Sequence, residues 1–286
     1  MNLADNDFYQ AWRAQKLALY PVTVNDLVVD IQDAEAASAK ELQQLKLHLR
    51  QYNFAFYRFV QQPVYRQQVH QLAQSLGLKT IAHNLCADAD SLTAIQVSQH
   101  QGQHDYIPYT DKKLSWHTDG YYNPAYEQIH GMLLHCVHPA LIGGETQLMD
   151  HELAYLLLRE ANPNYIQALM HPEALTIPAN ILNGETIRPA QTGPVFSINA
   201  DGSLHMRYSA RQKNVVWRDD PMTQAAVQFL LDLWEQASIY KLSYTLQAGE
   251  GLICNNVLHC RTAFTDASDS EQKRLLYRGR YLERAS

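Results

Sequence analysis

Two potential metal ligands lie two residues apart in the segment Trp116-His117-Thr118-Asp119-Gly120. Alternate side chains of a β-strand point to the same face, so His117 and Asp119 would be directed into one space. One further histidine would complete the set of two histidines and one carboxylate that holds non-heme Fe(II) and leaves positions open on the metal. The pair alone also fits a strand end at the surface with a solvated aspartate.

His259 is the candidate for the third ligand. It ends a segment that starts with Gly249-Glu250-Gly251 and continues with apolar residues, a pattern typical of a tight turn followed by a buried strand. A core histidine with no ligand role is the alternative interpretation. Because nearly half of the chain separates Asp119 from His259, the ligands can meet only if the fold brings two distant strands together.

A row of arginines follows His259. Alternation along Lys273–Tyr281 places Arg274, Arg278 and Arg280 on one face of a strand. An arginine inside a fold needs an anion, because an unpaired buried charge is costly, and a guanidinium binds a carboxylate in a bidentate manner. The row therefore predicts a site for an acidic cosubstrate, with a solvated strand face as the alternative.

Candidate substrate contacts are weaker. Arg207 and Arg211 share one face of an expected strand and could hold an anionic group of the substrate, or could belong to a salt-bridged exterior. Tyr109 and Tyr121 flank the His-x-Asp segment and could line the entrance to a pocket, or could be core residues.

The elements that position these residues are mainly β-strands. Aromatic and β-branched runs separated by Gly, Pro and Asn favour a sandwich or barrel, and helices are concentrated in the first quarter and in two insertions. The expected helices are 36–52, 63–76, 151–160, 163–170 and 221–237. The expected strands are 54–60, 94–98, 129–137, 146–149, 176–179, 195–198, 205–210, 242–246, 251–258 and 275–282.

Composition narrows the class of protein. The 286 residues are 46% hydrophobic and 18% charged, which excludes a disordered chain, and the net charge of −6 argues against nucleic acid as a partner. We find no apolar run long enough to span a membrane and no secretory pattern at the N-terminus. The four cysteines form no CxxC pair, as expected for reduced thiols in the cytoplasm. Without a linker, we expect a single domain over residues 1–286.

Together these segments resemble the Fe(II)/2-oxoglutarate-dependent dioxygenases of the taurine dioxygenase-like family (TauD/TfdA, clavaminate synthase-like). The matching pieces are 116–120, 139–146, 255–264 and 274–278, in the family's order. The resemblance implies a double-stranded β-helix, the jelly-roll or cupin-like core, with core motifs over about 110–282 and a cap and buttress over about 1–100. It implies iron ligands at His117, Asp119 and His259.

The resemblance also implies a site for 2-oxoglutarate. Thr146 and Arg274 would hold its far carboxylate, while Arg278 would face the substrate or share the anion, and a slip of the loop before Arg274 would exchange the roles of the two arginines. The implied reaction uses Fe(II), O₂ and 2-oxoglutarate to hydroxylate or desaturate an unactivated C–H bond, releasing succinate and CO₂. The expected substrate is a small carboxylate-bearing or amino-acid-like metabolite.

Two other interpretations stay open at this point. The first is a cupin-like metal enzyme that does not use 2-oxoglutarate, and the second is a binding barrel without catalysis. For partners, we expect a small-molecule substrate, neither nucleic acid nor membrane, and leave room for a homo-oligomer.

Overall fold

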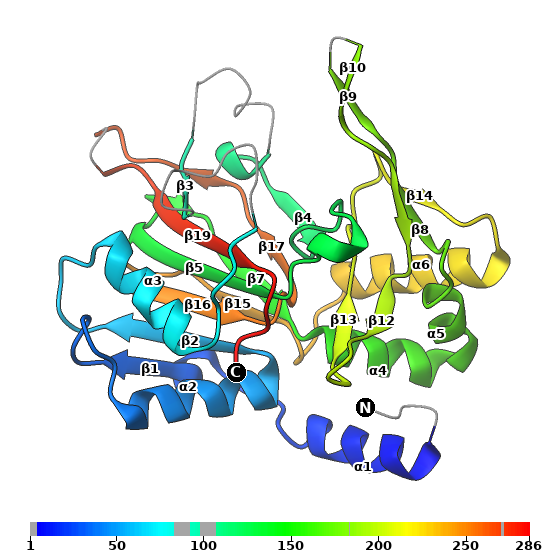
Figure 1. Cartoon of the computed structure of the whole chain (residues 1–286), viewed down its shortest axis with the longest axis horizontal. Helices are drawn as coiled ribbons and strands as arrows, with labels where there is room; N and C mark the ends of the chain where they lie inside the picture. The colour runs from blue at the N-terminus through cyan, green and yellow to red at the C-terminus, as the bar shows by residue number, and fades with distance from the viewer. Residues whose placement is uncertain (1–4, 83–91, 98–106, 183, 270–271) are drawn as a thin grey trace. The chain divides into compact units, whose positions relative to one another are not determined.

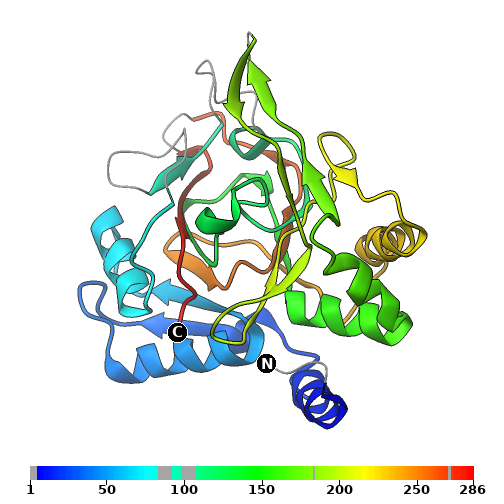
Figure 2. The same cartoon turned by 45° about the vertical axis from the view of Figure 1, so that its right-hand side comes forward.

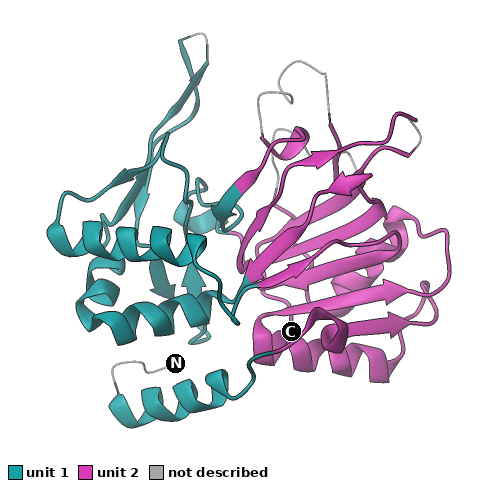
Figure 3. Cartoon of the chain, turned by 180° about the vertical axis from the view of Figure 1, so that it is seen from behind, with its two compact units in different colours: residues 1–21, 115–128, 149–241 teal, residues 22–114, 129–148, 242–286 magenta. Residues whose placement is uncertain are grey.

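The computed structural model describes residues 5–82, 92–97, 107–182, 184–269 and 272–286 (Figure 1). The chain divides into two compact units that are each assembled from separate segments (Figure 3). Unit 1 comprises residues 1–21, 115–128 and 149–241, and unit 2 comprises 22–114, 129–148 and 242–286. The expected single domain is not tested by this division and stays a prediction.

Unit 2 is built on a six-stranded sheet in the order β1-β2-β16-β5-β19-β3 (Figure 1). β1 and β2 are parallel, and the other neighbours are antiparallel. The strands are β1 (Val28–Ile31), β2 (Phe54–Phe59), β3 (Thr93–Ile95), β5 (Gly131–His138), β16 (Glu250–Cys254) and β19 (Leu275–Tyr281). Helices α2 (Ala39–Tyr52) and α3 (Arg66–Ser75) pack their apolar residues against this sheet in one core cluster.

The sequence explains where α2 begins and ends. Ser38 and Glu41 form a capping box, in which each side chain accepts a hydrogen bond from the other residue's backbone N–H. Asn53 ends the helix in the left-handed region at φ 61°. Leu45 and Leu49, one turn apart, are 0% and 1% exposed and face the sheet.

A four-stranded sheet has the order β15-β7-β17-β4, and a two-stranded ladder joins β6 to β18. The strands are β4 (Leu114–His117), β6 (Ile142–Gly143), β7 (Thr146–Met149), β15 (Leu242–Tyr244), β17 (Leu258–Arg261) and β18 (Phe264–Thr265). Two 3₁₀ turns, Val24–Leu27 and Ile107–Tyr109, also belong to unit 2, whereas β4 lies in unit 1 from Ser115 on. The stretch 251–258, expected as one strand, is broken at Asn256, whose φ of 49° cannot continue an extended chain.

Unit 1 combines helices with short strands. α4 (His151–Ala161), α5 (Pro163–Leu169) and α6 (Pro221–Glu235) pack against one another (Figure 2). α1 (Asn6–Leu17) and the 3₁₀ turn Ala125–Glu127 are the remaining helical elements. The strands are β8 (Leu175–Ile177), β9 (Asn180–Leu182), β10 (Glu185–Arg188), β11 (Gln191–Gly193), β12 (Phe196–Ile198), β13 (Leu204–Met206) and β14 (Val216–Trp217). β9 and β10 form a two-stranded ladder, and their side chains are largely exposed.

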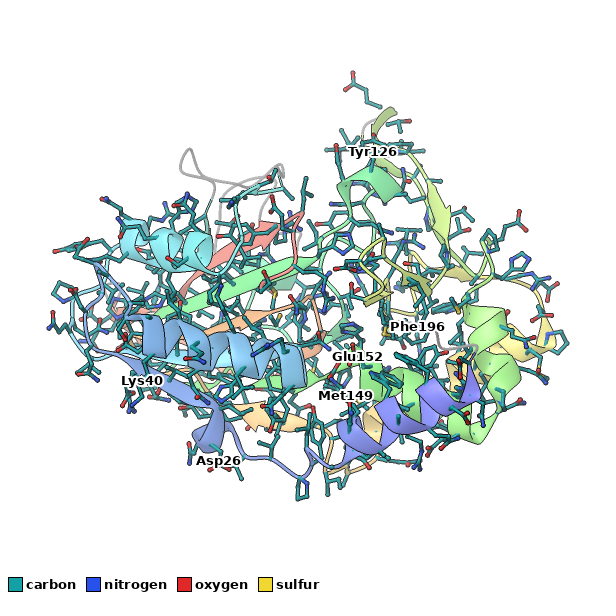
Figure 4. All side chains as sticks on the ribbon, turned by 60° about the horizontal axis from the view of Figure 1, so that its bottom comes forward. Asp26, Lys40, Tyr126, Met149, Glu152 and Phe196 are labelled. Atoms are coloured by element: carbon teal, nitrogen blue, oxygen red, sulfur yellow. The ribbon has the colours of Figure 1, made fainter. Side chains whose placement is uncertain are left out.

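The interior of unit 1 includes charged groups as well as aromatic ones. Phe196 is 1% exposed and meets Tyr155 edge to face, and Glu152 is 7% exposed (both Phe196 and Glu152 are labelled in Figure 4). Tyr126, by contrast, is 82% exposed (Figure 4). The expectation of a mainly β chain with helices is confirmed, as are the five expected helices apart from their ends. Among the described residues, no helix has the length and apolar character that a membrane span requires.

Candidate metal and cosubstrate site

His117 is the last residue of β4 and is 7% exposed. Its ring nitrogen Nδ1 lies 2.8 Å from the backbone oxygen of Ser115. A carbonyl only accepts, so Nδ1 carries the proton and Nε2 presents the lone pair that binds a metal. The hydrogen bond to Ser115 therefore determines that Nε2 is the nitrogen of His117 that can bind a metal.

His259 on β17 repeats the arrangement. It is 6% exposed, and its Nδ1 lies 2.9 Å from the backbone oxygen of Val257. Nε2 is again the nitrogen with the lone pair. Two histidines that are distant in the sequence thus have the same tautomer, fixed in each case by the residue two positions earlier.

Asp119 lies beyond the end of β4, although the sequence suggested that it shares a strand with His117. The segment is still held in extended pairing, because Thr118 N–H donates to the Tyr208 oxygen and Tyr208 N–H donates to Thr118 Oγ1, each at 3.0 Å. Asp119 is 6% exposed, and Gly120 turns the chain at φ 67°. The alternative of a solvated aspartate at a surface strand end does not fit this burial.

The structure brings the three predicted ligands together. His117, Asp119 and His259 each offer one ligand atom, and these atoms all lie within 4.8 Å of one another. Nε2 of His117 is 3.8 Å from Oδ1 of Asp119. Two neutral imidazoles and a carboxylate are the donor set that suits non-heme Fe(II), so the residues present fit that metal.

A second group lies in unit 2, where Thr146 and Arg274 line one small cavity together with Cys136, Gly144 and Leu276. Arg274 is 5% exposed, and no described group accepts a hydrogen bond from its Nη1. Burial lowers the pKa of Arg274, yet a guanidinium stays protonated at neutral pH. A buried cation with an unsatisfied donor, in a cavity that a threonine also lines, is suited to binding a carboxylate.

Arg278 and Arg280 are also buried, at 9% and 4% exposure, so the solvated-face interpretation of the arginine row does not fit. Arg278 lies opposite Leu134 of β5 and Thr93 of β3, within the six-stranded sheet. It does not line the cavity that holds Thr146 and Arg274. Arg274 thus lines this cavity and Arg278 does not, in the order in which the resemblance ranked them. Their roles toward 2-oxoglutarate stay a prediction.

The predicted substrate residues also differ in whether their polar groups are already hydrogen-bonded within the fold. Arg207 is 5% exposed and donates to the backbone oxygens of Tyr121, Leu175, Gly193 and Gln191. Burial, and after it the charge of Arg188, lowers the pKa of Arg207 to about 10. Its donors therefore connect strands β8 and β11 with the segment at Tyr121, all within unit 1. Its partners are carbonyls rather than the carboxylates of a salt-bridged exterior.

Arg211 and Tyr121 lie near a metal ligand. The Tyr121 ring meets the His117 ring edge-on, with 6.4 Å between centroids, and Arg211 Nη1 lies 3.5 Å from the Tyr121 hydroxyl. Tyr122 packs edge to face on Tyr121 at 5.2 Å, and Arg188 of β10 lies over the Tyr122 ring at 5.7 Å. Arg188 was not predicted, because nothing in the sequence marks this ladder as part of a site.

Tyr109 is 4% exposed in unit 2, which agrees with the core alternative for this residue.

The family model of the taurine catabolism dioxygenase TauD, TfdA family matches residues 15–280. The chain belongs to this family. The resemblance predicted from the four motifs is therefore confirmed, and with it the enzyme class, a dioxygenase. The TauD/TfdA match spans both units and all three predicted metal ligands.

Two curated relatives are similar in sequence. A uridine-5'-phosphate dioxygenase of Amycolatopsis sp is 32% identical over 177 residues, which is 59% of this chain and 60% of the relative. A uridine-5'-phosphate dioxygenase of Streptomyces sp is 30% identical over 203 residues, 68% of this chain and 70% of the relative. The chain thus aligns with about three fifths of the first relative's length.

Solved structures of the TauD/TfdA type share the fold. An asparagine oxygenase in complex with Fe(II), 2S,3S-3-hydroxyasparagine and succinate superposes with a TM-score of 0.63. The match covers 87% of this chain and 82% of that one at 16% identity, so it supports the fold alone.

Proposed function

We propose that this chain is an Fe(II)- and 2-oxoglutarate-dependent oxygenase that hydroxylates an unactivated C–H bond of a small molecule. One oxygen atom of O₂ enters the substrate and the other enters succinate, while CO₂ is released from 2-oxoglutarate. The observation that carries the proposal is the buried group of His117, Asp119 and His259. Fe(II) bound there would supply the oxidising chemistry, as in the family to which the chain belongs.

In this proposal the chain's residues bind and orient the cosubstrate and the substrate, and they exclude water from the site. His117, Asp119 and His259 would hold the metal, and this ligand set would leave positions for 2-oxoglutarate and O₂. Arg274 and Thr146 hold the far carboxylate, supported by the unsatisfied Nη1 and by their shared cavity. Arg278, which does not line that cavity, would face the substrate rather than share the anion. The two larger sheets would form the two layers of a double-stranded β-helix.

The substrate we propose is a nucleoside 5'-monophosphate, with uridine 5'-phosphate as the first compound to test. Support comes from the names of the two curated relatives and from the residues beside His117. Tyr121 and Tyr122 offer ring faces for a base, and Arg211 offers a guanidinium for a phosphate. The sequence predicted a substrate with an anionic group, and this proposal agrees with that, but the group is a phosphate rather than a carboxylate.

We further propose that the protein acts in the cytoplasm, where free nucleotides and 2-oxoglutarate are available. A small-molecule partner agrees with this function, whereas the homo-oligomer stays a prediction.

Anaerobic addition of Fe(II) and then 2-oxoglutarate to the metal-free protein tests the cofactors. A weak visible absorption band is expected, and after admission of air uridine 5'-phosphate should stimulate succinate release. Asp119→Asn should show neither effect. Absence of the band, with no succinate from any nucleotide or amino acid, would contradict the proposal. Succinate release with amino acids but not with nucleotides would contradict only the substrate.

The cupin-like alternative is tested with Arg274→Gln. If the protein uses 2-oxoglutarate, this substitution should raise its dissociation constant at least tenfold (about 1.4 kcal/mol), because the carboxylate loses a charged partner. Unchanged affinity would favour the alternative.

A further inference from the structure

Phe264 of β18 contacts two buried arginines. The guanidinium carbon of Arg261 lies 4.7 Å from the centroid of the Phe264 ring, and that of Arg274 lies 4.9 Å from it. All three side chains are at most 7% exposed. Each contact is a cation–π interaction, which gains strength when the pair is removed from water. One ring therefore links two cations that are thirteen positions apart in the sequence.

Arg261 is the fixed end of this arrangement. Its Nη2 donates to the backbone oxygens of Thr110 and Lys112, and the backbone N–H of Phe264 donates to the oxygen of Asp111. Three successive carbonyls of one segment thus hold both Arg261 and Phe264. A guanidinium held by two carbonyls presents its plane in one orientation.

Arg274 is the end that remains available. Its backbone N–H donates to Asp266, while its side chain lines the cavity with Thr146 and no described group accepts from Nη1. Gly144 bounds the same space: a Cβ there would lie 3.4 Å from Arg274 Nε and 3.5 Å from Phe264 Cβ. Gly144 adopts φ 72°, a conformation that favours glycine, so the turn passes close to the guanidinium without a side chain between them.

Two buried guanidinium groups near one another are unfavourable without an anion. Burial, followed by the charge of Arg274, lowers the pKa of Arg261 to about 10, and Asp111 and Asp266 act in the opposite direction. Both arginines stay protonated at neutral pH. The Phe264 ring and the two carbonyls therefore hold a second positive charge next to Arg274, whose Nη1 has no described acceptor.

We propose that Arg261 is a positioning residue which, through the ring of Phe264, holds the Arg274 guanidinium in the orientation that binds the far carboxylate of 2-oxoglutarate. This inference rests on the proposed function. It gives a role to the Arg261–Phe264 part of the sequence motif that follows His259, a role that neither residue could perform without the other. It predicts selectivity for a dicarboxylate, because the near end of the cosubstrate does not depend on Arg274.

The test compares two 2-oxoacids that differ only at the far end. Dissociation constants of 2-oxoglutarate and 2-oxopentanoate are measured by calorimetry on the Fe(II)-loaded protein without O₂. In Arg261→Gln and in Phe264→Leu, the constant for 2-oxoglutarate should rise about tenfold, the loss expected for a buried cation–π contact. The constant for 2-oxopentanoate should stay within about twofold. Phe264→Tyr keeps the ring and should restore the wild-type values.

Arg66→Gln is the matched control. Arg66 also stacks on a ring of unit 2, that of Tyr277 at 4.7 Å, and donates to a backbone oxygen, that of Leu92. It should leave both dissociation constants unchanged.

The inference is overturned if Arg261→Gln and Phe264→Leu leave 2-oxoglutarate affinity unchanged, or if they weaken both oxoacids equally, as general damage to the fold would. If Arg261→Gln does not fold, as judged by circular dichroism, Phe264→Leu against Phe264→Tyr decides alone. Wild-type protein that binds no 2-oxoglutarate would instead contradict the proposed function itself.

Discussion

The buried histidines and arginines differ in which of their nitrogen atoms can still bind a ligand. His117 and His259 each donate from Nδ1 to the backbone oxygen two residues earlier, which leaves Nε2 with the lone pair that binds a metal. Arg207 uses its donors on four carbonyls, whereas Arg274 retains Nη1. Burial alone does not distinguish these roles, but the identity of the hydrogen-bond acceptors does.

Asp119→Asn tests the metal group at this scale. The amide replaces the anionic ligand, so the protein should lose most of its Fe(II) and activity should fall at least about a thousandfold, as expected when a charge that holds the metal is removed. Metal content after anaerobic loading and gel filtration checks this. Full occupancy by Fe(II) in the variant would contradict the assignment of Asp119.

Arg207 and Arg211 should respond differently to substitution. Arg207→Met leaves buried carbonyls without donors and should lower the free energy of unfolding by about 3 kcal/mol. Urea unfolding measures this loss. Arg211→Gln, on an exposed residue, should leave the free energy of unfolding within about 0.5 kcal/mol. The same variant should raise the KM for uridine 5'-phosphate about tenfold, because a charge-assisted hydrogen bond is lost. The reverse pattern would exchange the two roles.

At the scale of elements, a buried ion cluster attaches α1 to the rest of unit 1. Lys16 Nζ lies 2.5 Å from Asp150 and 2.7 Å from Glu152, at the N-terminus of α4. Burial by itself would lower the pKa of Lys16, but the two carboxylates outweigh it and the pKa is raised. The helix is therefore held by charge as well as by the stacking of Arg159 on Tyr9.

Lys16→Met should lower the free energy of unfolding by about 3–5 kcal/mol, because two carboxylates lose their buried partner. The raised pKa means that the charged lysine stabilises the fold below its ordinary pKa near 10.5, and that this contribution is lost as the pH rises through the higher value in the fold. Thermal unfolding between pH 8 and about 11 checks both statements. A variant as stable as the parent would show that the cluster contributes no net stability.

His135 on β5 should make the free energy of unfolding depend on pH in the acid range. It is 1% exposed, stacks on Tyr57 and Tyr277, and burial lowers its pKa from 6.5 to about 4. Below pH 6.5 the unfolded chain takes up a proton that the folded chain does not, so stability should fall as the pH drops towards 4. The loss amounts to about 3 kcal/mol over that range.

Denaturant unfolding at a series of pH values measures this loss, and His135→Phe should flatten the curve between pH 6.5 and 4. An equally steep curve in the variant would assign the acid sensitivity to other groups.

The elements were largely predictable because helix caps and apolar strands are local signals. Asp220 and Pro221, for example, mark the start of α6 in the sequence. The break at Asn256 was missed: this residue has a left-handed conformation, and its amide donates to the Ile129 oxygen, a distant partner that no local pattern reveals. α1 was missed for a related reason: its burial rests on Lys16, whose partners lie far along the chain.

At the scale of the whole molecule, the three candidate ligands come from positions separated by nearly half of the chain, and their types and spacing made them predictable. The roles of Arg207, Arg188 and Arg261 were not, since they depend on carbonyls and rings that no local pattern reveals. The sequence thus predicts the metal ligands from residue types and spacing. The structure shows which buried arginines already donate to carbonyls or stack on rings.

Metal binding should stabilise the whole chain, because only the folded state assembles the three ligands. With Fe(II) or Mn(II) at one hundred times its dissociation constant, the gain is about 2.7 kcal/mol, or a rise in Tm of roughly 5–10 °C. Calorimetry with and without a chelator measures it. No shift in the parent, or an equal shift in Asp119→Asn, would contradict binding at this group.

The hydrogen bonds from Nδ1 of His117 and His259 also bear on how the site tolerates mutation. Each imidazole hydrogen-bonds a backbone oxygen two residues earlier in the chain, at Ser115 and at Val257. A substitution at either of those positions changes the side chain but keeps the carbonyl. The tautomer of the ligands is therefore robust to sequence drift, and an evolving or engineered descendant can alter the surrounding pocket while the two nitrogens stay available for the metal.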